Sequence, residues 1–249
     1  MQIGAQFYTL REQCRTLEDF ALSLKKVADI GYKTVQISGT CPYEAAWLKE
    51  QLAINDLQCV LTHIPVPRLT GETKQVIADH HVFGCEHIGL GWYAFNETDT
   101  YERFMATFPQ VAQEIRAGGR YFMYHNHDQE FKRVPGSGQI ILEKLAQEIP
   151  ADIMGFTLDT FWVQAGGGDP ARWIENLKGR VPVIHLKDFA YGRKMAVIGE
   201  GNINFDRVFS KAEESGTKYM LVEQDDCNGE DPIECLRRSY EYLKSCGFN

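Results

Sequence analysis

Short apolar runs alternate with longer amphipathic segments along the whole chain. Between Leu17 and Ile30 apolar residues recur every three or four positions, which predicts a helix, and Thr16 provides a capping side chain at its start. The short runs are mostly apolar rather than alternating, as expected for strands that are buried on both faces. We therefore predict eight strands, at residues 3–8, 33–37, 57–63, 86–90, 120–124, 154–158, 181–186 and 219–222.

A predicted helix follows each predicted strand. Gly31 and the pair Gly118-Gly119 mark helix ends, and Asp169-Pro170 combines a capping residue with proline at the first helical position. The predicted helices span residues 17–30, 42–54, 70–83, 98–117, 139–149, 171–177, 205–215 and 232–245.

Eight strand–helix units predict an α/β fold with a parallel sheet, and their combined length of 249 residues matches a (β/α)₈ or TIM barrel. No linker rich in Pro, Gly or Ser divides the chain, so we expect a single domain over residues 1–249. A doubly wound open sheet is the alternative. It would need a ligand loop after its first strand, and the nearest glycine motif, at residues 199–204, lacks the last glycine and lies elsewhere.

Composition and charge leave the predicted fold unchanged, but they argue against some classes of binding partner. The chain is 44% hydrophobic and 24% charged, which is ordinary for a globular protein. Its net charge of −8 makes it a poor ligand for nucleic acid or an anionic membrane. It has neither a signal-peptide pattern nor a run of roughly 18 apolar residues, and its seven cysteines lack CxxC spacing. We expect a cytoplasmic protein with reduced thiols.

Polar side chains gather where the predicted strands end. In a TIM barrel the carboxyl ends of the strands and the loops that follow form the face that carries the chemistry. The last four strands run into His125, Asp159, His185 and Glu223. Two imidazoles and two carboxylates suit Mn²⁺, Co²⁺, Zn²⁺ or Fe²⁺ better than Ca²⁺. We therefore expect these four residues to bind one divalent metal ion at the barrel axis.

Each candidate also has a plainer explanation when it is taken alone. His63, at the end of the third strand, is open to a structural or a substrate-binding role. Asp159 could cap the following turn, and Glu223 could be a carboxylate on the rim of the barrel. The metal site is favoured because four potential ligands recur at equivalent strand ends.

Six stretches extend this pattern over nearly the whole chain. They resemble the xylose isomerase-like TIM barrels, the sugar phosphate isomerase/epimerase superfamily, and they are specific for that superfamily but much less so for one activity. The stretches are QFYTLR at residues 6–11, YHNHDQEF at 124–131, LDTFWVQAGGGDP at 158–170, HLKD at 185–188, GEG at 199–201 and VEQ at 222–224.

The resemblance implies one divalent metal between a Glu, an Asp, a His and a second Glu. Asp159, His185 and Glu223 match the last three of these positions, whereas His125 stands where the family has its first glutamate. His125 replaces that ligand, or His127 binds instead, or this strand supplies no ligand. We favour His125.

The family's ketose epimerases exchange an α-proton between two metal-bound glutamates on opposite faces of the substrate. Here only Glu223 matches, so the resemblance implies Glu223 as proton acceptor, His127 as second acid/base and Lys187 as a residue that polarises a substrate oxygen. We predict a metal-dependent isomerase or epimerase acting on a sugar, keto-sugar or cyclitol. The alternative is a dehydratase or lyase acting on an inosose or a 3-oxo-glycoside.

Aromatic residues near the predicted loops are candidates for stacking on a sugar. Tyr8, Trp92 and Trp162 are predicted, with His63, to bind substrate. Lys187 has an alternative role as the salt-bridge partner of Asp188.

The sequence leaves two further classes of function to consider. A nuclease resembling endonuclease IV shares the barrel, but it needs more His and carboxylate ligands and a basic rim. A sugar-binding barrel without metal, or an accessory subunit, is a non-catalytic class. Closure of the site would fall to residues 190–204 or to a partner subunit, which leaves a homo-oligomer open.

Overall fold

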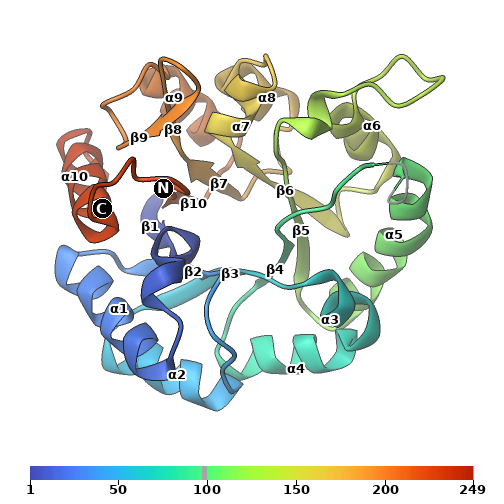
Figure 1. Ribbon diagram of the computed structural model, residues 1–249. Coiled ribbons are helices and arrows are strands. Elements are labelled where there is room, and N and C mark those ends of the chain that lie inside the picture. Colours follow the sequence, from blue (N-terminus) through green and yellow to red (C-terminus); the bar gives the residue numbers. More distant parts are fainter. Residues whose placement is uncertain (97–99, 249) are drawn as a thin grey trace.

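Parallel strand pairing closes a barrel in the computed structural model, which describes residues 1–96 and 100–248 (Figure 1). Seven strands follow one another around the barrel in sequence order, and β10 closes it by pairing with both β7 and β1. The (β/α)₈ prediction is confirmed. The strands of the barrel are β1 (Gln2–Gln6), β2 (Thr34–Ile37), β3 (Gln58–His63), β4 (His87–Leu90), β5 (Tyr121–His125), β6 (Met154–Asp159), β7 (Val183–Leu186) and β10 (Tyr219–Val222).

Helices surround the barrel and cover the outer face of its strands (Figure 1). None of those in the described part of the chain is both long and apolar enough to cross a membrane. They are α1 (Leu17–Ile30), α2 (Ala45–Ile54), α4 (Thr73–Val82), α5 (Tyr101–Ala117), α6 (Ile141–Glu148), α8 (Pro170–Asn176), α9 (Phe205–Glu214) and α10 (Pro232–Ser245).

Most predicted boundaries differ from those in the structure by one to three residues, and two of the differences have a clear local basis. The first strand ends at Gln6 instead of running to residue 8, because the Gln6 side chain accepts a hydrogen bond from the Tyr8 backbone N–H and caps a 3₁₀ helix. The helix predicted over residues 70–83 overlaps two helices, α3 (Val66–Gly71) and α4, which are separated at Glu72. The predicted start of α5 at residue 98 lies outside the described residues.

Short elements in the loops add structure that the pattern of apolar residues does not predict. Most of them follow a strand directly, so they lie on the same face of the barrel as the strand ends. They are η1 (Phe7–Gln13), α3 (Val66–Gly71), η2 (Gln129–Phe131), α7 (Thr160–Ala165) and a hairpin of β8 (Asp188–Ala190) and β9 (Lys194–Ala196).

The barrel interior holds an apolar cluster formed by Val60, Leu61, Met123, Val183 and Leu221. The last four of these lie two positions before a polar residue at a strand end. Side chains two positions apart in a strand face the same side. The polar residues at those strand ends therefore also face the barrel interior, next to this apolar cluster.

Candidate metal centre and active site

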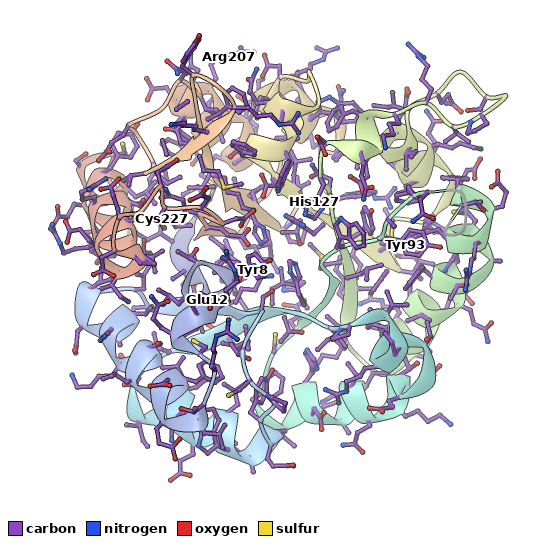
Figure 2. The ribbon with its side chains drawn as sticks, viewed as in Figure 1. Tyr8, Glu12, Tyr93, His127, Arg207 and Cys227 are labelled. Atoms are coloured by element: carbon purple, nitrogen blue, oxygen red, sulfur yellow. The ribbon has the colours of Figure 1, made fainter. Side chains whose placement is uncertain are left out.

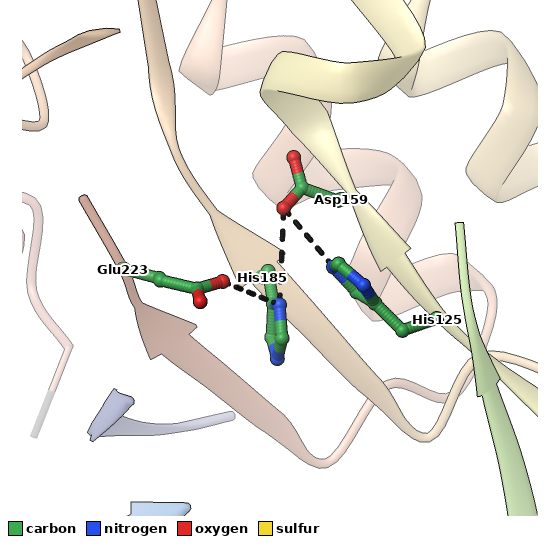
Figure 3. Close-up of side chains that lie close together, drawn as sticks. All are labelled: His125, Asp159, His185 and Glu223. Carbon is green, nitrogen blue, oxygen red and sulfur yellow. Dashed lines mark hydrogen bonds and ion pairs between the residues drawn. The ribbon is translucent and has the colours of Figure 1, made fainter. Parts of the chain in front are cut away.

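Four side chains from successive strand ends converge in the mouth of the barrel (Figure 3). His125 ends β5, Asp159 ends β6, His185 lies in β7 and Glu223 follows β10. Each is buried and offers one ligand atom, and these atoms all lie within 4.8 Å of one another. The structure thus brings together the four residues that were predicted as metal ligands.

The protonation of His125 fits a role as ligand. Its Nδ1 lies 3.0 Å from the backbone oxygen of Gly91, which can only accept a hydrogen bond. The proton is therefore on Nδ1, and the lone pair of Nε2 faces Oδ2 of Asp159 at 3.2 Å. His127 lies beside the cluster, with its ring centre 4.7 Å from that of His125, and is not one of the converging ligands.

The other donor atoms also fit a metal ion. Nδ1 of His185 lies 2.8 Å from Oε2 of Glu223 and 3.8 Å from Oδ2 of Asp159. Nδ1 of His185 is buried without a hydrogen bond of good geometry, and so is Oε2 of Glu223, although Oε2 lies within ion-pair distance of Lys187. Buried polar atoms are rarely left without a partner. Two nitrogen and two oxygen donors suit a divalent transition metal, which would be a partner for these atoms.

Asp159 is fixed by contacts on three sides. Its backbone N–H donates to Oδ1 of Asn126 at 3.0 Å, and its own Oδ1 accepts from the backbone N–H of Trp162 at 2.9 Å. That second bond caps the N-terminus of α7. Capping and participation in the cluster are therefore compatible, because Oδ2 remains directed at the two histidines.

Lys187 is a buried cation beside the cluster. Its Nζ lies 3.2 Å from Oδ2 of Asp159, 2.9 Å from Oε2 of Glu223 and 2.9 Å from Oδ1 of Asp225. Burial alone would lower the pKa of Lys187, but these three carboxylates outweigh it and raise that pKa. Burial would likewise raise the pKa of Glu223, but the positive charge of Lys187 outweighs burial and holds that pKa well below its usual value.

The alternative that Lys187 pairs with Asp188 is wrong. Asp188 instead accepts backbone N–H groups from the loop that follows the β8–β9 hairpin. Asp225 is the partner that sequence reasoning missed. The acidic run at residues 223–226 was its signal, but which carboxylate turns toward the lysine depends on the loop after β10.

A pocket of about 590 Å³ opens above the cluster. Figure 2 shows Tyr8 and His127 close to the centre of the barrel mouth. The exposed fractions of Tyr8 and Trp92 are 38% and 57%, so both offer ring surface to a ligand. All four residues that were predicted to bind substrate line this pocket, namely Tyr8, His63, Trp92 and Trp162, together with His127, Lys187 and Glu223.

His127 is held in place by a buried carboxyl group. Glu130 accepts hydrogen bonds from the Tyr124 hydroxyl at 2.5 Å and from the His127 backbone N–H at 2.7 Å. Burial raises the pKa of Glu130 to about 7. Burial, together with the nearby charge of Lys187, lowers the pKa of His127 to about 2, so its imidazole is neutral in this arrangement.

Comparison with known protein families identifies the family of the chain. A family model described as "Xylose isomerase-like TIM barrel" matches residues 24–246. The chain belongs to this family. The resemblance inferred from the sequence motifs is thereby confirmed. No curated protein matches the chain in sequence.

Solved structures of similar proteins include enzymes of sugar metabolism. A sugar phosphate isomerase/epimerase from Parabacteroides distasonis is 25% identical, with 98% of this chain and 93% of that chain covered at a TM-score of 0.85. An L-ribulose 3-epimerase is 15% identical, with 98% and 94% covered at a TM-score of 0.77. A probable 3-DHS dehydratase, AsbF from Bacillus anthracis, is 13% identical, with 98% and 99% covered at 0.75. The last two show a shared fold alone.

Proposed function

We propose that this protein is a divalent-metal-dependent isomerase or epimerase that moves a proton at the carbon next to the carbonyl of a sugar, keto-sugar or cyclitol. The observation that carries the proposal is the buried set of two imidazoles and two carboxylates at the base of a pocket with aromatic walls. The net charge of −8 supports a small-molecule substrate, because a nuclease must approach a polyanion.

The proposed ligands are His125, Asp159, His185 and Glu223. A divalent ion held by these residues would supply a Lewis acid for the substrate carbonyl. We expect Mn²⁺, Co²⁺, Zn²⁺ or Fe²⁺, because nitrogen ligands suit these ions.

Proton transfer is assigned to residues that line the pocket. Glu223 takes the α-proton, and the nearby Lys187 ammonium keeps its carboxylate ionised and therefore able to accept. His127 is the second acid/base, because its Nδ1 is buried without a partner and its ring lines the same pocket. Its pKa is lowered by burial, so this role requires a bound substrate oxygen to raise that pKa. Lys187 also hydrogen-bonds the oxygen on which negative charge develops.

We assign the aromatic residues that line the pocket to substrate binding. The rings of Tyr8, Trp92 and Trp162 provide flat apolar surfaces for the C–H face of a sugar ring. His63 lines the same pocket, with its ring centre 5.2 Å from that of His125, and provides a further polar contact.

A dehydratase or lyase is the second candidate, and the asymmetry of the site favours it. The two proposed acid/base groups are a carboxylate, Glu223, and an imidazole, His127, rather than two equivalent carboxylates. In an elimination one group removes the α-proton while the other gives a proton to the leaving hydroxyl or alkoxide, so two groups of different basicity suit it.

Incubation in D₂O separates these outcomes. The Mn²⁺-loaded protein is incubated with a panel of keto-sugars, inososes and 3-oxo-glycosides, and the products are analysed by NMR and mass spectrometry. Deuterium at an α-carbon with an unchanged skeleton supports isomerisation or epimerisation, whereas loss of water or of an alcohol supports the lyase. The Glu223→Gln variant is the control. No exchange with any compound, under any of the four metals, contradicts the proposal.

A further inference from the structure

Two buried glutamines stand side by side on neighbouring strands. Gln6 ends β1 and Gln36 lies in β2, and their Cα atoms are partners in the parallel pairing of these strands. The exposed fraction of each is 0%. Neither is one of the four proposed ligands, yet each makes a hydrogen bond to one of them.

Gln36 determines which nitrogen of His185 carries a proton. Its Oε1 lies 2.6 Å from Nε2 of His185. An amide oxygen only accepts hydrogen bonds, so Nε2 must be the protonated nitrogen. The other nitrogen, Nδ1, then has its lone pair free on the side that faces Asp159 and Glu223.

Gln6 fixes the carboxylate of Glu223 in a similar way. Its Oε1 accepts the Tyr8 backbone N–H at 2.7 Å, which orients the amide so that its Nε2 faces Glu223. That amide group donates to Oε1 of Glu223 at 2.8 Å. Because one carboxylate oxygen is occupied, Oε2 is the one left toward His185 and Lys187.

We propose that Gln6 and Gln36 are positioning residues of the metal site, which rests on the proposed function above. Gln36 selects the form of His185 that presents Nδ1, and Gln6 holds Glu223 so that it presents Oε2. The Nε2 group of Gln36 is buried without a partner. A glutamine kept only for packing would satisfy its own N–H groups or be replaced by an apolar residue, since an unsatisfied buried group destabilises the fold.

Metal affinity tests the proposal on the full chain. Calorimetric titration with Mn²⁺ compares the wild type with Gln6→Leu and Gln36→Leu, which keep the approximate volume and remove the hydrogen bond. Loss of a residue that orients a metal ligand typically weakens binding by about 10–100-fold, and we expect this increase in Kd for both variants. Gln36→Glu keeps an acceptor for Nε2–H, and we expect a smaller change.

Thr34→Val is the matched control. Thr34 is buried in the same strand as Gln36 and donates to the backbone oxygen of Ile3 at 3.1 Å, so its loss removes a buried hydrogen bond away from the cluster. We expect an unchanged Kd for Mn²⁺. Circular dichroism confirms that each variant is folded.

A second measurement does not depend on the leucine variants folding. In the Zn²⁺-loaded wild type, ¹⁵N NMR is expected to show a His185 Nε2–H that exchanges slowly with water because Gln36 binds it. Rapid exchange there, or folded leucine variants with the wild-type Kd, would overturn the roles of the glutamines while leaving the proposed function intact. A wild type that binds none of the metals overturns both.

Discussion

The ammonium nitrogen of Lys187 lies 2.9 Å from Oε2 of Glu223, so a lysine and a proposed metal ligand form an ion pair inside the barrel. Each side chain is almost completely buried. The pair therefore matters for the fold as well as for the chemistry, because an isolated charge at this depth would be strongly unfavourable.

Replacement of Lys187 by methionine tests that relationship. It leaves Asp159, Glu223 and Asp225 without their shared cation, and removal of one partner from a buried ion pair typically costs about 3–5 kcal/mol. We expect the free energy of unfolding to fall by about that amount in urea denaturation. Lys74→Met, on the exposed face of α4, is the control and should change it by less than about 0.5 kcal/mol. Equal stability of the two variants would contradict the buried pair.

Metal binding should stabilise the fold through the proposed ligands. At a Mn²⁺ concentration 100 times its Kd, the free energy of unfolding should rise by about 2.7 kcal/mol. Asp159→Asn keeps the oxygen that caps α7 but removes the charge, so we expect it to fold and to lose this increase. His185→Ala should lose it too. Thermal unfolding with and without Mn²⁺ makes the comparison, and an undiminished shift in both variants would exclude this site.

The pH dependence of stability should carry a contribution from Glu130. Burial raises its pKa from 4.5 to about 7, so between these values the folded protein binds more protons than the unfolded chain. Stability from this group is therefore full below pH 4.5 and declines as the pH rises to 7, by about 3 kcal/mol in total. Glu130→Gln cannot ionise and should show a flatter profile. Urea denaturation across this range measures the slope, and parallel profiles would refute the assignment.

Trp92 should contribute to substrate binding without affecting the metal. More than half of its surface is exposed in the pocket, so its removal leaves the core intact. We expect Trp92→Ala to raise KM by about two- to tenfold, as loss of an aromatic contact of about 0.5–1.5 kcal/mol implies, with little change in kcat. Leu22→Ala removes a large apolar residue that is 50% exposed on α1, outside the pocket lining, and should leave KM unchanged.

Asp188 should be important for stability rather than for catalysis. Its carboxylate is buried and accepts the backbone N–H groups of Phe189, Gly199, Gly201 and Ile203. Asp188→Asn replaces one acceptor with a donor that faces these N–H groups, and we expect a loss of about 2–3 kcal/mol. Gly201→Ala should also destabilise, because an added Cβ would lie 2.4 Å from Oδ1 of Asp188. Thermal unfolding of both variants tests this prediction. Their affinity for Mn²⁺ should stay the same as that of the wild type.

The barrel and the convergence of the four proposed ligands were predictable because both follow from regular patterns. Apolar runs of strand length mark the strands, and a polar residue that ends such a run at an inward position must face the axis. His125, Asp159, His185 and Glu223 all satisfy this rule. The choice between His125 and His127 also has a simple geometric basis, because His125 is the last residue of β5 and His127 lies beyond it.

Contacts between segments that are distant in sequence were not predictable. Lys187 and Asp188 are adjacent in the chain, which suggested a pair, but consecutive residues in extended backbone point in opposite directions. Lys187 therefore meets Asp225, while Asp188 meets the loop on the other side. Gln36 has no sequence signal of its own, because its partner is the ring of His185, on the opposite half of the chain.

The strand that precedes Glu223 also completes the barrel, since β10 pairs with β7 on one side and β1 on the other. During synthesis on the ribosome, β10 emerges after the other seven strands. A chain that contains His125, Asp159 and His185 but not yet β10 would leave two strand edges unpaired and would lack Glu223, the fourth proposed ligand. Pairing of residues 219–222 therefore closes both strand edges and brings Glu223 to the proposed metal site.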